Sequence, residues 1–224
     1  KKDRNFDDFS PSKFVGKSVA DLFETEKNSG LIDTAKIAVL NAISSKSLKD
    51  SGYRIVNDAD PIDLLEFTSG AKVTLVGAFR SYINLLADKD VKLRVLELDE
   101  GALKGDDKKY FVPAEKYSEV IPDSDIVIIT GLSLVNNTID GLLDVVNPGT
   151  KLVVTGPSAG ILPQILFKKG VNIIGATEIL DSEMYEKLLR WLNIPLSEGE
   201  IFKISYAVLA IFCLVLFLRS KFFK

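Results

Sequence analysis

From Lys72 to about residue 180, short β-branched runs alternate with stretches in which apolar residues recur at helical spacing. Helices that connect successive strands in this way form right-handed βαβ crossovers, which align the strands in parallel. We therefore expect an α/β domain in which helices flank a parallel sheet. The predicted strands are Val73–Val76, Lys92–Leu98, Ile126–Thr130, Lys151–Thr155 and Val171–Ile174, and the predicted helices are Arg80–Ala87, Ala114–Val120, Ile139–Val146, Leu162–Lys168 and Ser182–Trp191.

The region before this domain, residues 1–60, contains helical signals but no strand pattern. Ser18 precedes a short apolar stretch and is expected to cap a helix there. A longer helix is expected to begin at Asp33 or Thr34, because apolar residues follow at the spacing of one helical face. Asp60-Pro61 is typical of an N-cap followed by proline at the first helical position. The apolar face of the longer helix is expected to contain Ile37, Leu40 and Ile43.

The chain ends in an apolar tail. Ile204–Leu218 carries no charge, and basic residues follow it. A membrane-spanning helix needs roughly 20 apolar residues, so the tail is short for that role. A membrane anchor over residues 201–218 and a buried final element both fit the pattern. The expected organisation is a partial helical region over 1–60, a Rossmann-like domain over 61–205 and the apolar tail over 206–224.

Composition excludes several classes of function. The net charge is −3, and residues 201–224 hold four of the 28 basic side chains and no acid, so the rest is acidic and nucleic acid is not an expected partner. The chain has no histidine, and Cys213 is its only cysteine. Zinc, haem and iron–sulfur sites built from these residues are therefore excluded. An oxygen-ligated cation bound by Glu97, Asp99 and Asp181 stays open. Without a signal peptide or disulfides, we expect a cytoplasmic protein, with membrane anchoring through the tail open.

The loops after the first two strands suggest a ligand site. In open parallel sheets, ligands bind beyond the carboxyl ends of the strands. Gly77 follows the first strand, and Glu97 ends the second strand twenty residues later, where a dinucleotide-binding fold places a ribose-binding acid. The full glycine fingerprint is absent, because Phe79 and Tyr82 stand where further glycines would be. A tight turn beside a solvated edge carboxylate explains the same residues equally well.

The loop after the third predicted strand is rich in hydroxyl and amide groups, which bind polar ligands without titrating. Thr130, Gly131, Asn136 and Thr138 are the candidate ligand-binding residues in this loop. Helix capping is the alternative role, with Thr138 as the N-cap of the helix that begins at Ile139.

The fourth predicted strand leads into Gly156-Pro157-Ser158-Ala159-Gly160, which matches the G-x-S-x-G turn of α/β-hydrolases. That chemistry needs a base, ordinarily histidine, to take the serine proton. No histidine is present, and Ile161 stands where a Ser-x-x-Lys arrangement would place a lysine. We therefore reject the hydrolase interpretation. Gly156, Pro157 and Ser158 are instead predicted to form a nest that binds an anion or a carbonyl group.

Several of these motifs, in order, resemble the family described as "putative heavy-metal chelation". The resemblance implies a Rossmann-like C-terminal domain over roughly residues 70–205, preceded by an N-terminal domain similar to that of enolase. The expected strands of that N-terminal domain are missing or reduced to residues 1–12. The matching segments are Val76–Phe79, Leu96–Leu98, Asp125–Gly131, Leu134–Thr138, Gly156–Ser158, Gly170-Val171, Gly175–Thr177 and Ser197–Phe202 in the C-terminal part, with Gly16–Phe23 and Ala38–Ser44 in the N-terminal part.

The leading hypothesis is a protein that binds a small molecule, in the biosynthesis or handling of a metal-chelating metabolite. Its ligand, nucleoside-like or pterin-like, would lie between the strand-end loops and the N-terminal helices. The ring of the ligand is expected to be held by Gly77, Phe79 and Glu97. Its polar or anionic end is expected to meet Thr130, Asn136, Gly156 and Ser158. Soft metals need thiolate or imidazole ligands, which this sequence lacks in its body. The alternative hypothesis is a non-catalytic, membrane-anchored interaction module with a degenerate Rossmann-like domain. Neither an enzymatic reaction nor a homo-oligomer is decided by the sequence.

Overall fold

The computed structural model describes residues 18–27, 29–48 and 51–177. The chain divides into two compact units, one of residues 1–51, 160–162 and 177–224 and the other of residues 52–159 and 163–176. Asp181, the predicted helix Ser182–Trp191, the segment Ser197–Phe202 and the tail over 201–218 lie outside the described residues. The domain boundaries expected at residues 60 and 205 stay predictions. In the described part of the chain, no helix is long and apolar enough to cross a membrane.

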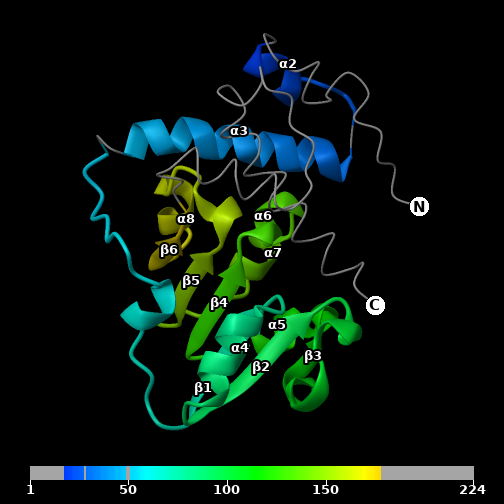
Figure 1. Ribbon diagram of the computed structural model, residues 1–224, viewed down its shortest axis with the longest axis vertical. Coiled ribbons are helices and arrows are strands. Elements are labelled where there is room, and N and C mark those ends of the chain that lie inside the picture. Colours follow the sequence, from blue (N-terminus) through cyan, green and yellow to red (C-terminus); the bar gives the residue numbers. More distant parts are fainter. Residues whose placement is uncertain (1–17, 28, 49–50, 178–224) are drawn as a thin grey trace, which may run out of the picture. The chain divides into compact units, whose positions relative to one another are not determined.

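The larger unit is built on a six-stranded sheet in the order β3-β2-β1-β4-β5-β6, and every pair of neighbours is parallel (Figure 1). This is the strand order of a Rossmann sheet, and its order reverses between β1 and β4. The predicted Rossmann-like α/β fold is confirmed. The strands are β1 (Ala71–Val76), β2 (Val91–Glu97), β3 (Phe111–Pro113), β4 (Ile126–Thr130), β5 (Lys151–Thr155) and β6 (Ile173–Gly175).

Two of the predicted strands, β4 and β5, have the bounds expected from the sequence. The edge strand β3 was not predicted, because three residues that end in a proline carry little strand pattern. At the other edge, β6 begins at Ile173, two residues later than expected. The long apolar strands in the middle of the sheet were therefore easier to predict than its short edges.

Helices connect the strands, and several are shorter than predicted. The first connection is α4 (Arg80–Ala87), with the predicted bounds. Leu132–Val135 was expected to be a loop but forms a helical turn, α6. The other helices of this unit are α5 (Tyr117–Val120), α7 (Ile139–Leu143) and α8 (Gln164–Lys168), with 3₁₀ turns η2 (Pro61–Leu64), η3 (Glu100–Ala102), η4 (Gly105–Tyr110), η5 (Ala114–Lys116) and η6 (Pro157–Ala159).

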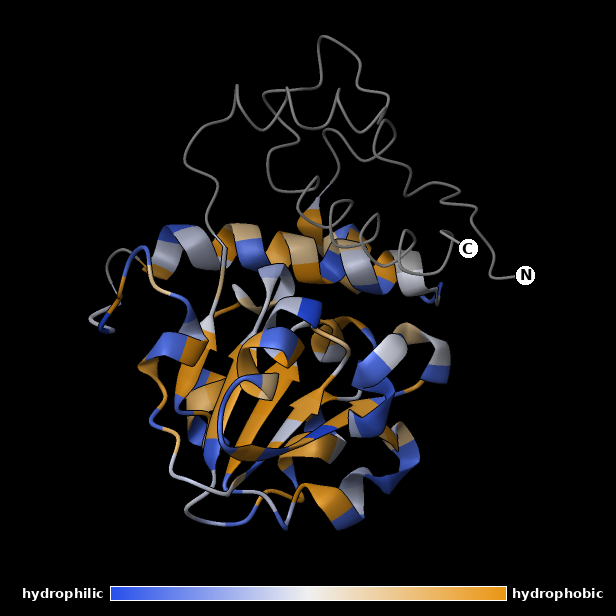
Figure 2. Ribbon diagram, turned by 60° about the horizontal axis from the view of Figure 1, so that its bottom comes forward, coloured by the Kyte–Doolittle hydropathy of each residue, from blue (hydrophilic) through white to orange (hydrophobic). Residues whose placement is uncertain are grey.

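The core lies against the central strands, which are the most hydrophobic part of the unit in Figure 2. Val73, Leu75 and Ile128 are fully buried there, and α4 adds Tyr82, Ile83 and Leu86. Burying each large apolar side chain contributes about 1.5–3 kcal/mol. The carboxyl ends of the strands are thus fixed by a rigid core, which positions the loops that follow them.

The smaller unit contains α2 (Val19–Phe23) and α3 (Gly30–Leu48). Ser18 caps α2 as predicted, since its hydroxyl oxygen accepts the N–H of Ala20 at 3.2 Å. The cap predicted for α3 was wrong, because the hydroxyl oxygen of Ser29 accepts the N–H of Ile32 at 3.3 Å and the helix has already begun at Gly30. Thr34 lies inside the helix, where its hydroxyl donates to the carbonyl of Gly30.

The predicted apolar face of α3 was also wrong. Ile37 and Leu40 are only half-buried and Ile43 is exposed, whereas Ala38, Asn41 and Ser44 are buried. Small and polar side chains carry almost no hydropathy signal, so the burial of this stripe could not be inferred from apolar spacing.

Candidate functional site

The carboxyl edge of the sheet brings together five of the predicted site residues. A Cβ atom added to Gly77 would lie 3.0 Å from Cγ2 of Thr130, which places the loops after β1 and β4 in contact. A Cβ atom added to Gly156 would lie 3.6 Å from the amide nitrogen of Gly131 and 3.6 Å from the Phe79 ring. The loops after β1, β4 and β5 therefore converge where the strand order reverses, which is the usual position of a ligand in this fold.

The turn at Gly156–Ser158 does not expose its serine. Ser158 lies in η6 and is only 4% exposed, and a Cβ atom on Gly131 would meet its carbonyl carbon at 3.2 Å. Pro157 is half-buried. A hydrolase nucleophile sits exposed at the top of such a turn, so the burial of Ser158 agrees with the rejection of that chemistry.

Asn136 and Thr138 are exposed and lie beyond the helical turn α6, whereas Thr130 is half-buried at the strand end. Thr138 occupies the predicted N-cap position of α7, but its side chain makes no capping bond there. Its backbone N–H donates to the carbonyl of Ser133 at 2.9 Å, and its hydroxyl lies 3.5 Å from the same oxygen. Asn136 and Thr138 are therefore exposed to solvent beyond α6, apart from the five predicted site residues that meet at the strand ends.

The backbone amides of the converging loops are already hydrogen-bonded inside the chain. The N–H of Gly77 donates to the carbonyl of Leu96 at 2.9 Å, and the N–H of Gly131 donates to that of Thr155 at 2.8 Å. The N–H of Gly156 donates to the carbonyl of Gly175 at 3.0 Å. A nest for an anion needs amides that point at the ligand. The paired amides disfavour a phosphate site of the dinucleotide-binding kind.

Glu97 binds backbone amides of two loops. Its Oε2 atom accepts the N–H of Ala78 at 2.9 Å, and its Oε1 atom accepts those of Leu98 at 2.7 Å and Asp99 at 3.2 Å. The carboxylate therefore joins the loop after β1 to the loop after β2, and it occupies the place that an anion would take beside Ala78. An ionised carboxylate has about four acceptor positions, so room remains for one ligand hydroxyl.

A buried tyrosine near this edge was missed as a candidate by the sequence analysis. The hydroxyl of Tyr82 donates to Oδ1 of Asp60 and contacts the Thr155 side chain. Burial, followed by the hydrogen bond to Asp60, raises the pKa of Tyr82 well above its ordinary value, so the phenol is neutral at physiological pH. The centroids of the Tyr82 and Phe79 rings lie 5.5 Å apart, so the tyrosine packs against the Phe79 ring and supports it.

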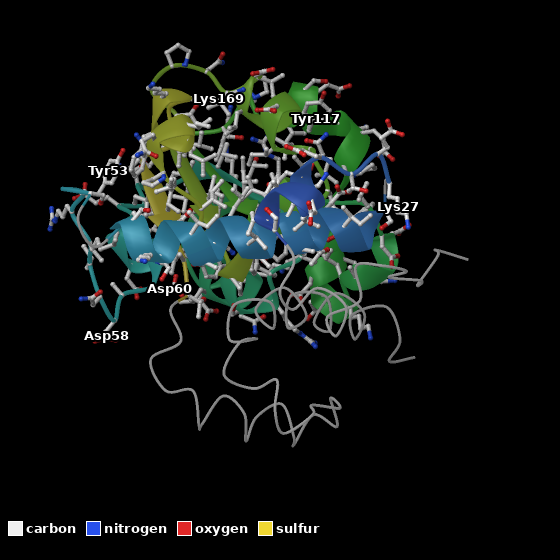
Figure 3. All side chains as sticks on the ribbon, turned by 90° about the horizontal axis from the view of Figure 1, so that it is seen from above. Lys27, Tyr53, Asp58, Asp60, Tyr117 and Lys169 are labelled. Carbon is white, nitrogen blue, oxygen red and sulfur yellow. The ribbon has the colours of Figure 1, made fainter. Side chains whose placement is uncertain are left out.

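Asp60, labelled in Figure 3, also accepts the N–H of Ile62 at 3.1 Å, which confirms its predicted role as an N-cap. The helix that it caps is the 3₁₀ turn η2. The spacing of Phe79 and Tyr82, three residues apart at the start of α4, was the one signal that could have linked this tyrosine to the site. Phe79 was predicted from the sequence to hold the ring of the ligand, whereas Tyr82 was noted only as a departure from the glycine fingerprint.

A separate pocket of about 460 Å³ opens at the opposite, amino edge of the sheet. Its walls come from the end of α7, the start of β5 and the loop before β6. None of the predicted site residues lines it.

Comparison with known proteins decides the family. The pattern of the family described as "Putative heavy-metal chelation" (DUF364) matches residues 60–191. This chain belongs to that family. An uncharacterized protein of Methanocaldococcus jannaschii is 32% identical over 84 residues, which are 38% of this chain and 31% of that protein. The chain thus matches less than a third of the length of that relative.

Two solved DUF364 structures of unknown function have a similar fold. One, from Desulfitobacterium hafniense, has a TM-score of 0.61 and 18% identity, over 79% of this chain and 68% of that one. The other, from Pyrococcus horikoshii, has a TM-score of 0.50 and 20% identity, over 74% and 70% respectively. These likenesses support the Rossmann-like fold.

The family description names heavy metals, but the side chains of this DUF364 member do not fit them. Soft metal ions select thiolate and imidazole ligands. The sequence has no histidine, and its one cysteine lies outside the described residues. Within residues 18–27, 29–48 and 51–177, no three acidic or cysteine side chains are grouped as metal ligands. Asp181, the third member of the predicted oxygen site, also lies outside the described part, and Glu97 is bonded to amides.

Proposed function

We propose that this DUF364 protein binds a small, ring-bearing organic molecule without phosphate groups at the carboxyl edge of its sheet. The observation that carries the proposal is the half-buried Phe79 ring, which lies against Gly156 and is supported by Tyr82. A flat ring of a nucleoside or pterin stacks well on such an aromatic side chain. Glu97 has an acceptor position left for a hydroxyl or amino group of the same ligand.

The charge of the ligand follows from the paired amides. Ala78 donates its N–H to a carboxylate of the chain, and Gly131 and Gly156 donate theirs to backbone carbonyls. A phosphate at this edge would face the Glu97 carboxylate and would find these donors already used. A neutral ligand such as a pterin, or a cationic one such as S-adenosylmethionine, meets neither obstacle.

On this proposal, the protein takes part in metal chelation by binding an organic molecule and not the metal ion itself. Because the body of the chain offers no thiolate or imidazole, a soft metal is better held by a chelator than by the protein itself. The proposed ligand is such a chelator, or a precursor from which one is made.

Isothermal titration of the full 224-residue chain tests the proposal. S-adenosylmethionine and neopterin are the probes, and ADP and NAD are their phosphate-bearing counterparts. We expect saturable binding of at least one of the first two, and binding of both phosphate compounds at least roughly tenfold weaker. Equal or tighter binding of ADP or NAD, or no binding of either non-phosphate probe, would show that the proposal is wrong.

A pair of variants assigns the binding to the proposed edge. Phe79→Ala should weaken binding of the ring by about 1–3 kcal/mol, the usual contribution of stacking on an aromatic side chain. Phe167→Ala is the matched control, because Phe167 is a partly exposed aromatic residue of α8 whose ring makes a tilted contact with Tyr53. If both variants bound as well as the natural chain, or lost the same affinity, the ring would not lie on Phe79.

A further inference from the structure

The pocket at the amino edge of the sheet has an apolar floor. Leu143, at the end of α7, and Leu152, in β5, are buried beneath it, and Val146 is half-buried at its side. Its volume of about 460 Å³ lies within the range of roughly 300–1,000 Å³ that small-molecule sites occupy. The pocket can therefore hold the hydrocarbon or aromatic part of a small ligand.

The charged side chains that line the pocket are all basic. Lys151 and Lys169 belong to the lining, and no aspartate or glutamate does. Lys151 makes no ion pair with any residue that the structure describes. The positive charge of Lys151, unpaired within the described residues, therefore favours an anion over a cation at its side of the pocket.

Lys169, labelled in Figure 3, is the more constrained of the two lysines. Its Nζ atom lies 2.8 Å from a carboxylate oxygen of Asp140 and 3.5 Å from one of Asp144. Both carboxylates are largely exposed, and ion pairs in water contribute little to stability. A ligand carboxylate can therefore share or displace these contacts at small cost.

Asn172 adds a neutral donor to the same wall. Its Oδ1 atom accepts the N–H of Leu152 at 2.7 Å, which fixes the side chain and leaves its Nδ2 group to donate. Asn147 is held by a bond from its Nδ2 atom to the carbonyl of Pro122 at 2.9 Å. The side chains of Asn147 and Asn172 are thus positioned by bonds that run within the domain.

We propose that this pocket binds a small organic carboxylate with an apolar body, as a second site separate from the carboxyl edge. The apolar body packs on Leu143, Val146 and Leu152, and the carboxylate accepts hydrogen bonds from Lys151 and Lys169. Asn172 donates a further hydrogen bond to the same oxygen atoms.

A titration of the ¹⁵N-labelled full chain with sodium 1-naphthoate, followed by amide chemical shifts, tests the site. Saturable shifts are expected at Gly149, Lys151, Gly170 and Asn172, which line the pocket. Sodium acetate, which lacks the apolar body, and 1-naphthylmethylamine, which has the opposite charge, should each bind at least roughly tenfold more weakly. Absence of saturable shifts at these amides, or equal binding of the amine, would overturn the proposal.

Matched lysine variants separate specific contacts from general attraction. Lys151→Gln and Lys169→Gln should each weaken naphthoate binding roughly tenfold, as expected for the loss of a charged hydrogen bond. Lys168→Gln removes the same charge from an exposed neighbour outside the pocket and should leave the affinity unchanged. An equal loss of naphthoate affinity in all three variants would mean that only the net charge of the protein matters, and would refute the site. Unchanged binding in both Lys151→Gln and Lys169→Gln would refute it as well.

Discussion

At the scale of single residues, Tyr82 joins three segments that are distant in the sequence. It lies in α4, its hydroxyl donates to Asp60 before β1, and the same hydroxyl contacts Thr155 at the end of β5. Its ring also supports Phe79 at the proposed ligand site. A buried polar group with satisfied hydrogen bonds orders its surroundings. The Tyr82 side chain is therefore expected both to stabilise the folded chain and to hold the carboxyl edge in its observed arrangement.

Replacement of Tyr82 by phenylalanine tests this link. Tyr82→Phe keeps the ring and removes the hydroxyl, which should lower the free energy of unfolding by about 1–2 kcal/mol at neutral pH. Urea denaturation measures the difference. Tyr117→Phe is the control, since Tyr117 lies in α5 and is only half-buried. A loss no larger in Tyr82→Phe than in Tyr117→Phe would contradict the role given to the hydroxyl.

The raised pKa of Tyr82 also predicts a dependence on pH. The ordinary value is 10.0 and the folded value is higher, so the folded chain holds this proton more tightly than the unfolded chain does. The resulting stabilisation is fully present below pH 10 and is lost as the pH rises toward the folded value. Between about pH 10 and 11.5, unfolding free energy should fall less steeply in Tyr82→Phe than in the natural chain. Equal slopes in urea titrations at these pH values would exclude the shift.

Glu97 gives a second prediction at this scale. Glu97→Gln replaces one acceptor oxygen by an NH₂ group that faces backbone N–H donors, so we expect a loss of about 1–3 kcal/mol in unfolding free energy. Glu100→Gln, three residues further on and exposed, should change it by less than about 0.5 kcal/mol. Thermal or urea unfolding of the two variants distinguishes an anchoring carboxylate from a merely solvated one, which would show equal small effects.

At the scale of elements, glycines let the strand-end loops pack against one another. Gly77 has a positive φ of 97° and faces the Thr130 side chain, and Gly175 faces Pro61 and Thr155. From the sequence, Gly77 was expected to belong to the ligand site after the first strand. The structure adds a packing role, because the space beside Gly77 is already filled by Thr130.

A set of glycine variants measures that packing. Gly77→Ala should destabilise the chain through both its positive φ and the contact with Thr130, at about 1–3 kcal/mol in total. Gly170→Ala has a similar φ of 91° but open space around the new Cβ atom, so it measures the backbone strain alone. The difference should shrink when Thr130→Ser, which removes the Cγ2 atom, is combined with Gly77→Ala. If Gly77→Ala and Gly170→Ala lowered the free energy of unfolding equally, the contact between Gly77 and Thr130 would not contribute to stability.

At the scale of the whole molecule, the sequence predicted the sheet better than the site. Buried runs such as Ile126–Thr130 predict a strand and its bounds well, because a central parallel strand is apolar on both faces. Short elements such as β3 and α6 have too few residues to show a period. The contact of Tyr82 with Asp60 depends on how distant segments meet, which no local pattern contains.

The strand-end residues were chosen as candidates because fold and ligand position are coupled in parallel sheets. Their hydrogen bonds could not be predicted, since the same Gly77 and Glu97 fit an open anion site and a closed internal one equally well. The structure shows the amides paired and Glu97 bonded to Ala78, and the proposal that the ligand carries no phosphate group rests on these bonds. That proposal is the central claim.

A crystal structure of the full chain grown with S-adenosylmethionine or neopterin, and a second one grown with ADP, test this claim most directly. In the first structure we expect a ring stacked on Phe79, with a hydroxyl or amino group at Glu97. In the second we expect no phosphate at the amides of Ala78 or Gly156. A phosphate bound to those amides, with the Glu97 carboxylate displaced from Ala78, would contradict it.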